Sequence, residues 1–374
     1  MTSLGPSSLG LVGLEAGMPL VGPSSIHIDV TNSCNTNCVT CWDHSPHLAE
    51  PRSAAWKKQQ VDLARVEELL DDAGSLGALQ AVVISGMGDP FVHPQVYELL
   101  DAVKSRGLHL TVITNLIPAD PERVIALDVD QLLIGIHAAS EEAYRAFHPS
   151  FRSDEWTRLH RALERFHAAG RRYKHVQVIC GHNAHELVDM VRLGQRYDAA
   201  RVNFKLAGLK AGTEAVRISP EQRRELIEVL VPAAQDEALK LGVTTNLDVF
   251  ERQLSAGGEA TAPISEIGCF MGYVYSRILV DGTVLYCCNT EVEIGSLQEA
   301  RFHELWRGER WEAWRARFRK GDYLESCNQC GKINENVKLS RRFERRFGTE
   351  RLHQVTGREA AGRALPLAPS RSGS

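Results

Sequence analysis

Three cysteines, Cys34, Cys38 and Cys41, lie close together in the segment CNTNCVTC. Three residues separate the first pair and two separate the second. Thiolates at such spacings bind metals. A closed zinc site takes four ligands, and His44 or His47 is a candidate for the fourth. A cubane iron–sulfur cluster held by only three thiolates keeps one iron open to a reacting molecule. The spacing alone leaves both the zinc and the iron–sulfur interpretations open.

The overall composition excludes several classes of protein. The chain has 374 residues, a formal net charge of −4 and a pI near 6.4, whereas nucleic-acid and anionic-membrane surfaces need a basic excess. No stretch approaches the roughly 20 apolar residues of a membrane span. The first 22 residues carry no Lys or Arg to start a signal peptide. We therefore expect a cytoplasmic protein with no nucleic-acid and no membrane partner. Its nine cysteines are then not expected to form disulfides, and their close spacings indicate metal or redox work.

Strand-like and helix-like segments alternate along most of the chain. Six strand-like segments are each followed by a helical one, and they span residues 24–30, 80–85, 109–115, 131–137, 174–180 and 200–206. Six such units predict an α/β fold, an incomplete (β/α)6 TIM-like barrel with its active site at the carboxyl ends of the strands. Strand and turn signals before Trp-rich helices predict a second, small α+β domain. We expect a flexible leader (1–22), the barrel (23–215), linking helices (216–261), the second domain (262–345) and a basic disordered tail (346–374).

The predicted strands carry polar residues on one face. Side chains alternate along a strand, so His27 and Asp29 share a face of the first strand, opposite its isoleucines. His137 and Lys205 hold the same kind of position at the ends of the fourth and sixth strands. A strand covered on both faces reads as nearly continuous apolar sequence, and these do not. The pattern predicts a polar barrel lumen suited to a polar substrate; the alternative is that these groups only satisfy one another.

The cysteine motif directly after the first strand of an incomplete barrel resembles the radical S-adenosylmethionine (radical SAM) superfamily. In that family the open iron of a 4Fe-4S cluster binds the amino and carboxylate groups of SAM. Reductive cleavage of SAM then gives a 5′-deoxyadenosyl radical, which abstracts hydrogen from the substrate. The cofactor carries the difficult chemistry and the protein positions it. The resemblance implies that Cys34, Cys38 and Cys41 hold this cluster.

The segment GMGDP after the second strand is similar to the Gly-Gly-Glu-Pro segment that holds the SAM amino group in this family. Gly88 and Pro90 match that segment and Met87 departs from it. Asp89 also departs, but it keeps a carboxylate. The resemblance implies SAM contacts from this segment and from Asn115, in the Thr-Asn pair that ends the third strand.

Four later cysteines resemble the auxiliary-cluster region of radical SAM enzymes with SPASM or Twitch domains: Cys269, Cys287, Cys327 and Cys330. A full SPASM domain carries seven cysteines and two clusters, so this chain looks like the shorter Twitch form with one additional 4Fe-4S cluster. Spacing from the turn glycine favours Cys287, and the adjacent Cys288 stays an alternative. A structural zinc at the Cys-x2-Cys pair is the other interpretation of these residues.

The cluster count and spacing are most similar to those of radical SAM aminocyclitol dehydrogenases. This implies an oxidoreductase that dehydrogenates a small polar metabolite such as a sugar or aminocyclitol, with the second cluster as electron acceptor. The short segment before the first strand makes a peptide substrate less expected. The alternatives are a redox-neutral epimerase or decarboxylase, a peptide-modifying maturase, and a non-enzymatic iron–sulfur protein.

The proposed oxidation needs groups of the chain besides the cofactors. An external one-electron reductant such as flavodoxin or ferredoxin is implied. His137 is the predicted base that removes the substrate proton, because neutral histidine is available near pH 7. Lys205 is the predicted cation that orients the substrate. The alternative for His137 is a hydrogen bond to SAM or to the backbone alone.

Overall fold

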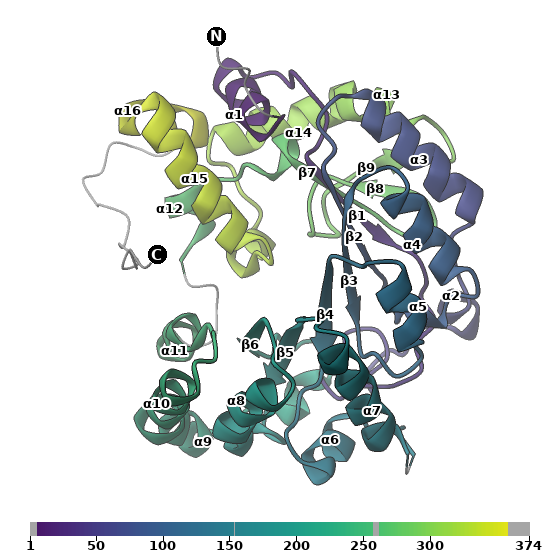
Figure 1. The fold of residues 1–374 in the computed structure, drawn as a ribbon. Helices are drawn as coiled ribbons and strands as arrows, with labels where there is room; N and C mark the ends of the chain where they lie inside the picture. Colours follow the sequence, from purple (N-terminus) through teal and green to yellow (C-terminus); the bar gives the residue numbers. More distant parts are fainter. Residues whose placement is uncertain (1–5, 153, 257–261, 358–374) are drawn as a thin grey trace.

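A nine-stranded sheet runs through the computed structural model, which describes residues 6–152, 154–256 and 262–357 (Figure 1). The strand order is β6-β5-β4-β3-β2-β1-β7-β8-β9. The strands are β1 (Ser25–Asp29), β2 (Ala81–Ser85), β3 (His109–Thr114), β4 (Gln131–Gly135), β5 (Lys174–Ile179), β6 (Arg201–Leu206), β7 (Tyr275–Ile278), β8 (Thr283–Leu285) and β9 (Glu293–Ser296). The pairs from β6 to β7 are parallel, and those of β8 are antiparallel.

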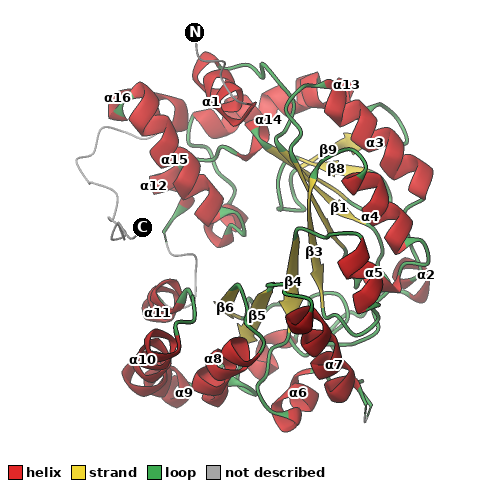
Figure 2. Cartoon of the chain, viewed as in Figure 1, coloured by secondary structure: helices red, strands yellow, loops and turns green. Residues whose placement is uncertain are grey.

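Helices follow the strands and cover the outside of the sheet (Figure 2). Those of the first part are α1 (Pro6–Ala16), α2 (Ala54–Lys57), α3 (Leu63–Ser75), α4 (Val96–Lys104), α5 (Pro121–Ala126), α6 (Glu141–Phe147), α7 (Glu155–Ala168) and α8 (Leu187–Arg196). The later ones are α9 (Pro220–Glu225), α10 (Val231–Leu241), α11 (Leu247–Ser255), α12 (Ile264–Ile267), α13 (Phe302–Arg307), α14 (Glu309–Arg319), α15 (Ile333–Phe347) and α16 (Thr349–Thr356). Six successive βα units in one open parallel sheet confirm the predicted incomplete barrel.

The two faces of the barrel strands differ as the alternation predicts. Ile26 and Ile28 of β1 are buried against the helices, as are Val82 and Ile84 of β2, each with at most 1% of its surface exposed. β1 and β2 pair in register, so these side chains form continuous rows under the helices. The opposite face of β1 turns its polar side chains into the lumen. Burial of the apolar rows is what fixes the register of the strands that carry the site.

The second region does not form a sheet of its own. β7 pairs in parallel with β1, with Ser25 opposite Tyr275 and His27 opposite Arg277. β8 and β9 then extend the same sheet in antiparallel fashion. Without β7 the free edge of β1 would leave a row of backbone groups unpaired. One wall of the lumen therefore continues from the barrel into the second region.

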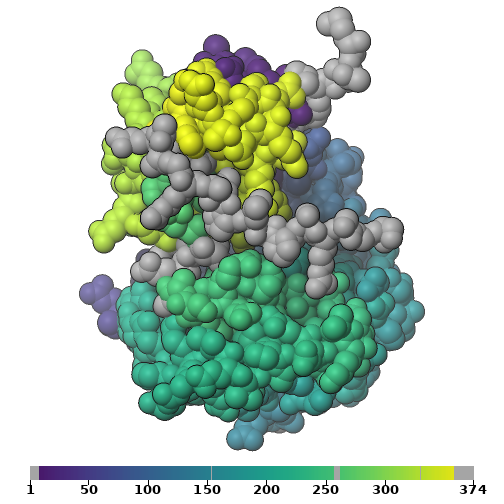
Figure 3. Space-filling view, turned by 90° about the vertical axis from the view of Figure 1, so that its left-hand side faces the viewer, coloured from purple at the N-terminus to yellow at the C-terminus, as the bar shows by residue number. Residues whose placement is uncertain are grey.

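Both ends of the described chain are helical where the sequence predicted loose segments. α1 buries Leu11 and Leu14, and Arg351 of α16 forms an ion pair with Glu15. In Figure 3 the residues near the C-terminus (yellow) lie close to those near the N-terminus (purple). Part of the predicted leader and the start of the predicted tail thus pack against each other, because apolar side chains of the leader find a helix to cover them. Residues 358–374 lie outside the described residues.

Candidate active site

The cysteine loop begins at the carboxyl end of β1. Its three thiols, Cys34, Cys38 and Cys41, are all half-buried. Burial raises the pKa of Cys34 to about 12, and the carboxylate of Asp89 contributes to the shift. The pKa of Cys38 is raised well above its usual value, first by burial and then by its two neighbours, Cys34 and Cys41. The thiols therefore lie near one another, and binding a metal cluster must release their protons.

Backbone hydrogen bonds hold this loop in place. The Val39 N–H donates to the Phe147 carbonyl at 3.0 Å, which ties the loop to the end of α6. The Cys41 N–H donates to the Cys38 carbonyl at 3.0 Å, so the second pair of thiols is joined by a tight turn. The three cysteines are thus carried by a loop that backbone hydrogen bonds hold in place, not by a helix or a strand.

The GMGDP segment packs directly on the cysteine loop. The Gly88 N–H donates to the Thr31 carbonyl at 3.1 Å, and the Asp89 N–H donates to the Ser33 carbonyl at 3.0 Å. A Cβ atom on Gly88 would lie 1.8 Å from the Ser33 carbonyl oxygen. Glycine is required here because another backbone approaches closely. The next residue, Pro90, is buried and begins a short 3-10 helix, Pro90–Val92.

Asp89 has protein partners for both carboxylate oxygens. It accepts hydrogen bonds from the Phe91 N–H at 3.0 Å and the Asn115 N–H at 2.7 Å. The Thr114 hydroxyl donates to it at 2.8 Å. The side chain is only 3% exposed, and burial raises its pKa to about 6 despite these donors. In this arrangement Asp89 joins the GMGDP segment to the end of β3, a structural role that the sequence did not predict.

Asn115 links the end of β3 to the cysteine loop. Its amide donates to the Asn35 side-chain oxygen at 2.8 Å, and the Asn35 amide donates back at 3.2 Å. The Asn115 oxygen also accepts from the Ile117 N–H at 3.0 Å. The structure therefore brings Asn115 into the predicted site, in contact with the residue that follows Cys34.

The geometry of His137 argues against its predicted role as a base. The Val178 N–H donates to His137 Nδ1 at 3.0 Å, so the neutral ring carries its proton on Nε2. A backbone N–H cannot reverse its direction, and a proton on Nδ1 would set two donors against each other. Burial, followed by nearby His148, lowers the pKa of His137 well below its usual value. The Val178 contact therefore counts against a base at His137, because the tautomer depends on a backbone group of β5. The hydrogen bond to the backbone that was the alternative is present.

Lys205 lies at the end of β6 with an exposed side chain. Within the described residues it forms no ion pair. Its role as a substrate-orienting cation stays a prediction.

The later cysteines gather at the other end of the lumen wall. Cys269 precedes β7, which runs parallel to β1, and Cys288 follows β8, which runs antiparallel. Both therefore lie at the amino end of β1, whereas Cys34 lies beyond its carboxyl end. Cys327 lies in a 3-10 helix, Glu325–Gln329, and Cys330 directly follows this helix, before α15. The pKa of Cys269 is raised to about 12, first by burial and then by Cys327 and Cys288.

The structure distinguishes the two adjacent cysteines. Cys288 is half-buried, and its thiol is hydrogen-bonded to those of Cys287 and Cys330, which hold its pKa low. Cys288 also appears among the groups that raise the pKa of Cys327 and of Cys269. Cys287 is buried in the main hydrophobic core, and its thiol pairs with Cys288. The contacts therefore favour Cys288, where spacing favoured Cys287.

Three thiols at the carboxyl end of β1 and four at its amino end fit two iron–sulfur clusters, because thiolates are the usual ligands of such clusters. In the described part of the chain, no three Cys, His, Asp or Glu side chains converge on one point as ligands of a single ion would. Cys34, Cys38 and Cys41 would hold a cluster with one open iron at the carboxyl end. Four thiols at the amino end would close a second cluster.

A polar network lines the lumen between these two groups of thiols. The buried Asp29 carboxylate accepts hydrogen bonds from Arg277, at 2.7 and 3.0 Å, and from the Ser85 hydroxyl at 3.2 Å. His27 bridges two hydroxyls: Nε2 contacts the Ser85 Oγ, and Nδ1 lies 3.1 Å from the Tyr275 hydroxyl. The network thus runs along the wall from the carboxyl end of β1 to the amino end of β7.

Sequence reasoning found only part of this network. Alternation along the first strand identified His27 and Asp29, whereas Tyr275, Arg277 and Lys332 were missed. The first two alternate in the same way along β7, which is the signal that could have found them. The ammonium of Lys332 lies 4.1 Å from the centre of the Tyr275 ring, and no sequence pattern indicates this contact.

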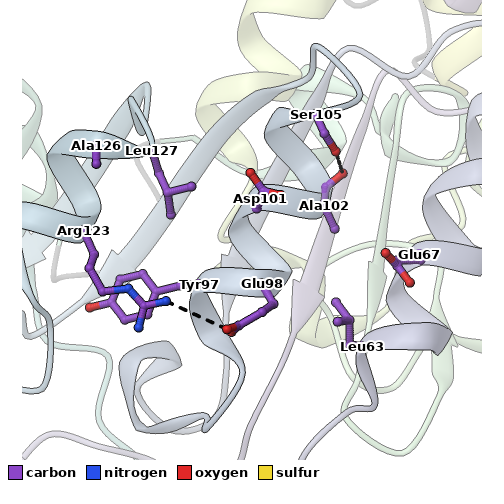
Figure 4. Close-up of a pocket in the computed structure, with 10 residues that line it drawn as sticks. All are labelled: Leu63, Glu67, Tyr97, Glu98, Asp101, Ala102, Ser105, Arg123, Ala126 and Leu127. Carbon is purple, nitrogen blue, oxygen red and sulfur yellow. Dashed lines mark hydrogen bonds and ion pairs between the residues drawn. The ribbon is translucent and has the colours of Figure 1, made fainter.

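A cavity of about 560 Å³ lies on the outside of the barrel, between α3, α4 and α5 (Figure 4). Arg123 lies over the Tyr97 ring, 3.7 Å from its centre, and points toward Glu98, 3.9 Å away. The predicted site residues do not line this cavity. It is therefore separate from the candidate active site.

Comparison with known sequence families matches two segments of the chain. The profile of the Radical SAM superfamily matches residues 28–194. The chain contains a radical SAM domain. The profile of SPASM, an iron-sulfur cluster-binding domain, matches residues 269–331, which include the four predicted auxiliary cysteines and Cys288. The resemblance read from the motifs is confirmed.

Relatives of this radical SAM enzyme cover most of its length. The AdoMet-dependent heme synthase of Nitratidesulfovibrio vulgaris is 24% identical over 343 residues, 87% of this chain and 89% of the relative. Streptococcus suis SuiB bound to S-adenosylmethionine matches with a TM-score of 0.61 at 16% identity, covering 88% of this chain and 74% of SuiB. Native anSMEcpe with bound AdoMet and Cp18Cys peptide gives 0.59 at 14% identity, covering 89% and 99%. At these identities the two solved structures establish the fold.

The family and the site geometry together identify the cofactors. This radical SAM enzyme uses SAM and 4Fe-4S clusters. Among the described residues, no helix is both long and apolar enough to cross a membrane.

Proposed function

We propose that this chain is a radical SAM oxidoreductase that dehydrogenates a polar substrate held in the barrel lumen. The observation that carries the proposal is the position of the two thiol groups, at opposite ends of the wall formed by β1 and β7. A substrate between them lies within reach of one site for hydrogen abstraction and another for electron uptake. An enzyme that carries out a net oxidation needs a place for the second electron, and the second site would supply it.

The residues at each end suit a different task. When bound, SAM and its cluster supply the radical that abstracts a hydrogen atom from the substrate. The GMGDP segment, Asn35 and Asn115 fix the cysteine loop that holds this cluster. At the other end, ligation by Cys269, Cys288, Cys327 and Cys330 would leave no iron open, which suits a site that takes up only an electron.

The lumen supports a polar substrate such as a sugar or an aminocyclitol. The His27 side chain is 12% exposed and can form hydrogen bonds with hydroxyl or amino groups in the lumen, whereas the buried Asp29 acts through its contacts with His27 and Arg277. Arg277 is 15% exposed there. Lys205 at the far wall would orient the substrate as a cation.

Heme formation is the second candidate function. The heme synthase relative matches nearly the whole of both chains, which favours a related substrate. The sequence-based preference against a peptide substrate finds no support in the comparisons. One relative is a PqqA peptide cyclase, and the anSMEcpe structure contains a bound peptide.

The test is substrate oxidation by the anaerobically reconstituted enzyme with SAM and reduced flavodoxin. Deuterated sugars, aminocyclitols, heme precursors and peptides would each be supplied, and deuterium in 5′-deoxyadenosine would identify the substrate. The proposal predicts a product two hydrogens lighter, formed one-to-one with 5′-deoxyadenosine. A redox-neutral product would contradict it and support the epimerase-type alternative.

A further inference from the structure

Burial lowers the pKa of both His27 and His137 well below its usual value, but the two lumen-facing histidines differ in the hydrogen-bond partner of Nδ1. That partner decides whether Nδ1 has room for a proton. Nδ1 of His137 faces the Val178 N–H, a donor that cannot turn. Nδ1 of His27 faces the Tyr275 hydroxyl at 3.1 Å. A hydroxyl is both a donor and an acceptor and rotates to suit its partner. Protonation at Nδ1 is therefore blocked in His137 and open in His27.

We propose that His27 accepts the proton that the substrate loses during oxidation, with the Tyr275 hydroxyl as the point of entry. This inference rests on the proposed function, since only an oxidation releases such a proton. Sequence alternation placed His27 on the lumen face, but no role in the chemistry followed from it.

The orientation of the hydrogen bonds sets the direction of transfer. The Ser85 hydroxyl donates to Asp29, so its oxygen is left to accept from Nε2–H of His27. The Nδ1 atom of His27 then has only a lone pair, and the Tyr275 hydroxyl donates to it. A proton that reaches the Tyr275 oxygen from the substrate can push the phenol proton onto Nδ1 of His27.

Burial, followed by the cations of Arg277 and Lys332, holds the pKa of His27 low, and Asp29 is the anion placed to offset this cost when the imidazolium forms. Its Oδ1 lies 3.4 Å from His27 Nε2, and the Ser85 hydroxyl joins the two groups by a second route. Asp29 is fully buried and paired with Arg277, so its charge is fixed in position. A charge in such a low-dielectric place acts more strongly than one in water.

Transfer at this place also balances the electrons. Hydrogen abstraction leaves a substrate radical, which loses a proton to His27 and one electron to the auxiliary cluster, and a C=O or C=N bond forms. Tyr275 is beside the auxiliary thiols, because Cys288 is the first charged neighbour that raises its pKa. The proton and the electron therefore leave the substrate at the same end of the lumen.

The test separates SAM cleavage from product formation in the holoenzyme. In His27→Gln the side chain keeps hydrogen-bonding groups but cannot take a proton, so we expect 5′-deoxyadenosine formation to continue. The ratio of oxidised product to 5′-deoxyadenosine should fall by about 10²- to 10⁴-fold. Ser85→Ala, which cuts one link to Asp29, should lower the same ratio by about tenfold. Freeze-quenched His27→Gln samples should show an organic radical signal by electron paramagnetic resonance.

His303→Gln is the matched control, because His303 forms a comparable pair with Asp72 on the outer surface, at 2.7 Å. Its product ratio should equal that of the wild type. Iron content and thermal melting of each variant show whether the fold is kept.

The outcomes distinguish this inference from the function on which it rests. A wild-type ratio in His27→Gln, or a parallel loss of product and 5′-deoxyadenosine, overturns His27 as the proton acceptor and leaves the oxidation intact. A redox-neutral product from the wild-type enzyme overturns both.

Discussion

Asn35 of the cysteine loop and Asn115 at the end of β3 exchange two side-chain hydrogen bonds, of 2.8 and 3.2 Å. Each amide is both a donor and an acceptor, so the pair fixes the orientation of both side chains. The first cysteine is next to Asn35 in the chain. The distance from β3 to the cluster loop is therefore set by this pair, not by the loop alone.

Asn115→Asp should loosen the cysteine loop, because a carboxylate cannot donate to the Asn35 oxygen. Both residues are half-buried, and we expect a loss of about 1–2 kcal/mol in the free energy of unfolding. In air, the variant should lose its SAM-site cluster faster than the wild type does. The decrease in absorbance of the iron–sulfur band measures this loss. Asn334→Asp, at an exposed position of α15, is the control. Equal rates of cluster loss in the two variants would contradict the role of the pair.

Asp89→Ala should destabilise the protein rather than weaken SAM binding alone. The change leaves three buried donors, from Phe91, Thr114 and Asn115, without an acceptor. We expect a loss of about 2–4 kcal/mol in urea unfolding of the apoprotein. Asp248→Ala, on the exposed side of α11, should change stability by less than about 0.5 kcal/mol. Unchanged stability together with weakened SAM affinity would restore the role that the motif implied.

The same carboxyl group should make stability depend on pH. Burial raises the pKa of Asp89 from 3.8 to about 6, so the folded state holds the proton more tightly than the unfolded state. Its contribution is complete below pH 3.8 and is lost as the pH rises toward 6. Relative to Asp89→Asn, which does not titrate, the wild type should lose up to about 3 kcal/mol across this range. A constant difference between the two unfolding curves would show that the pKa is not raised.

Local patterns predicted what depends on the chain nearby. Alternation along the first strand placed Ile26 and Ile28 under the helices, and the cysteine spacing identified the loop at its end. The tautomer of His137 and the partners of Asp89 depend on backbone groups of other strands, which no local pattern reports. The pairing of β7 with β1 was missed for the same reason, because Tyr275 lies 250 positions after Ser25, its partner in the sheet. No local pattern spans that distance.

Replacement of the two adjacent cysteines should separate their roles. Cys288→Ser removes the thiol that contacts Cys330, so the reconstituted protein should hold about four irons instead of about eight. Cys287→Ser changes a thiol buried in the core and should keep about eight. Cys180→Ser, at the end of β5, is the control for loss of a buried thiol. Loss of iron in Cys287→Ser alone would return the ligand to the position that spacing favoured.

Gly88→Ala tests the contact between the GMGDP segment and the cysteine loop. The added Cβ would lie 1.8 Å from the Ser33 carbonyl oxygen, and because both partners are backbone, neither can move aside alone. We expect the variant to lose SAM binding and the SAM-site cluster, with about four irons left at the auxiliary site. Gly74→Ala is the matched control: no atom lies within 4 Å of its added Cβ, and it lies within α3. That change should raise the free energy of unfolding by about 0.5–1 kcal/mol, because alanine favours a helix over glycine. Full iron content and normal SAM affinity in Gly88→Ala would show that the two segments do not need this close approach.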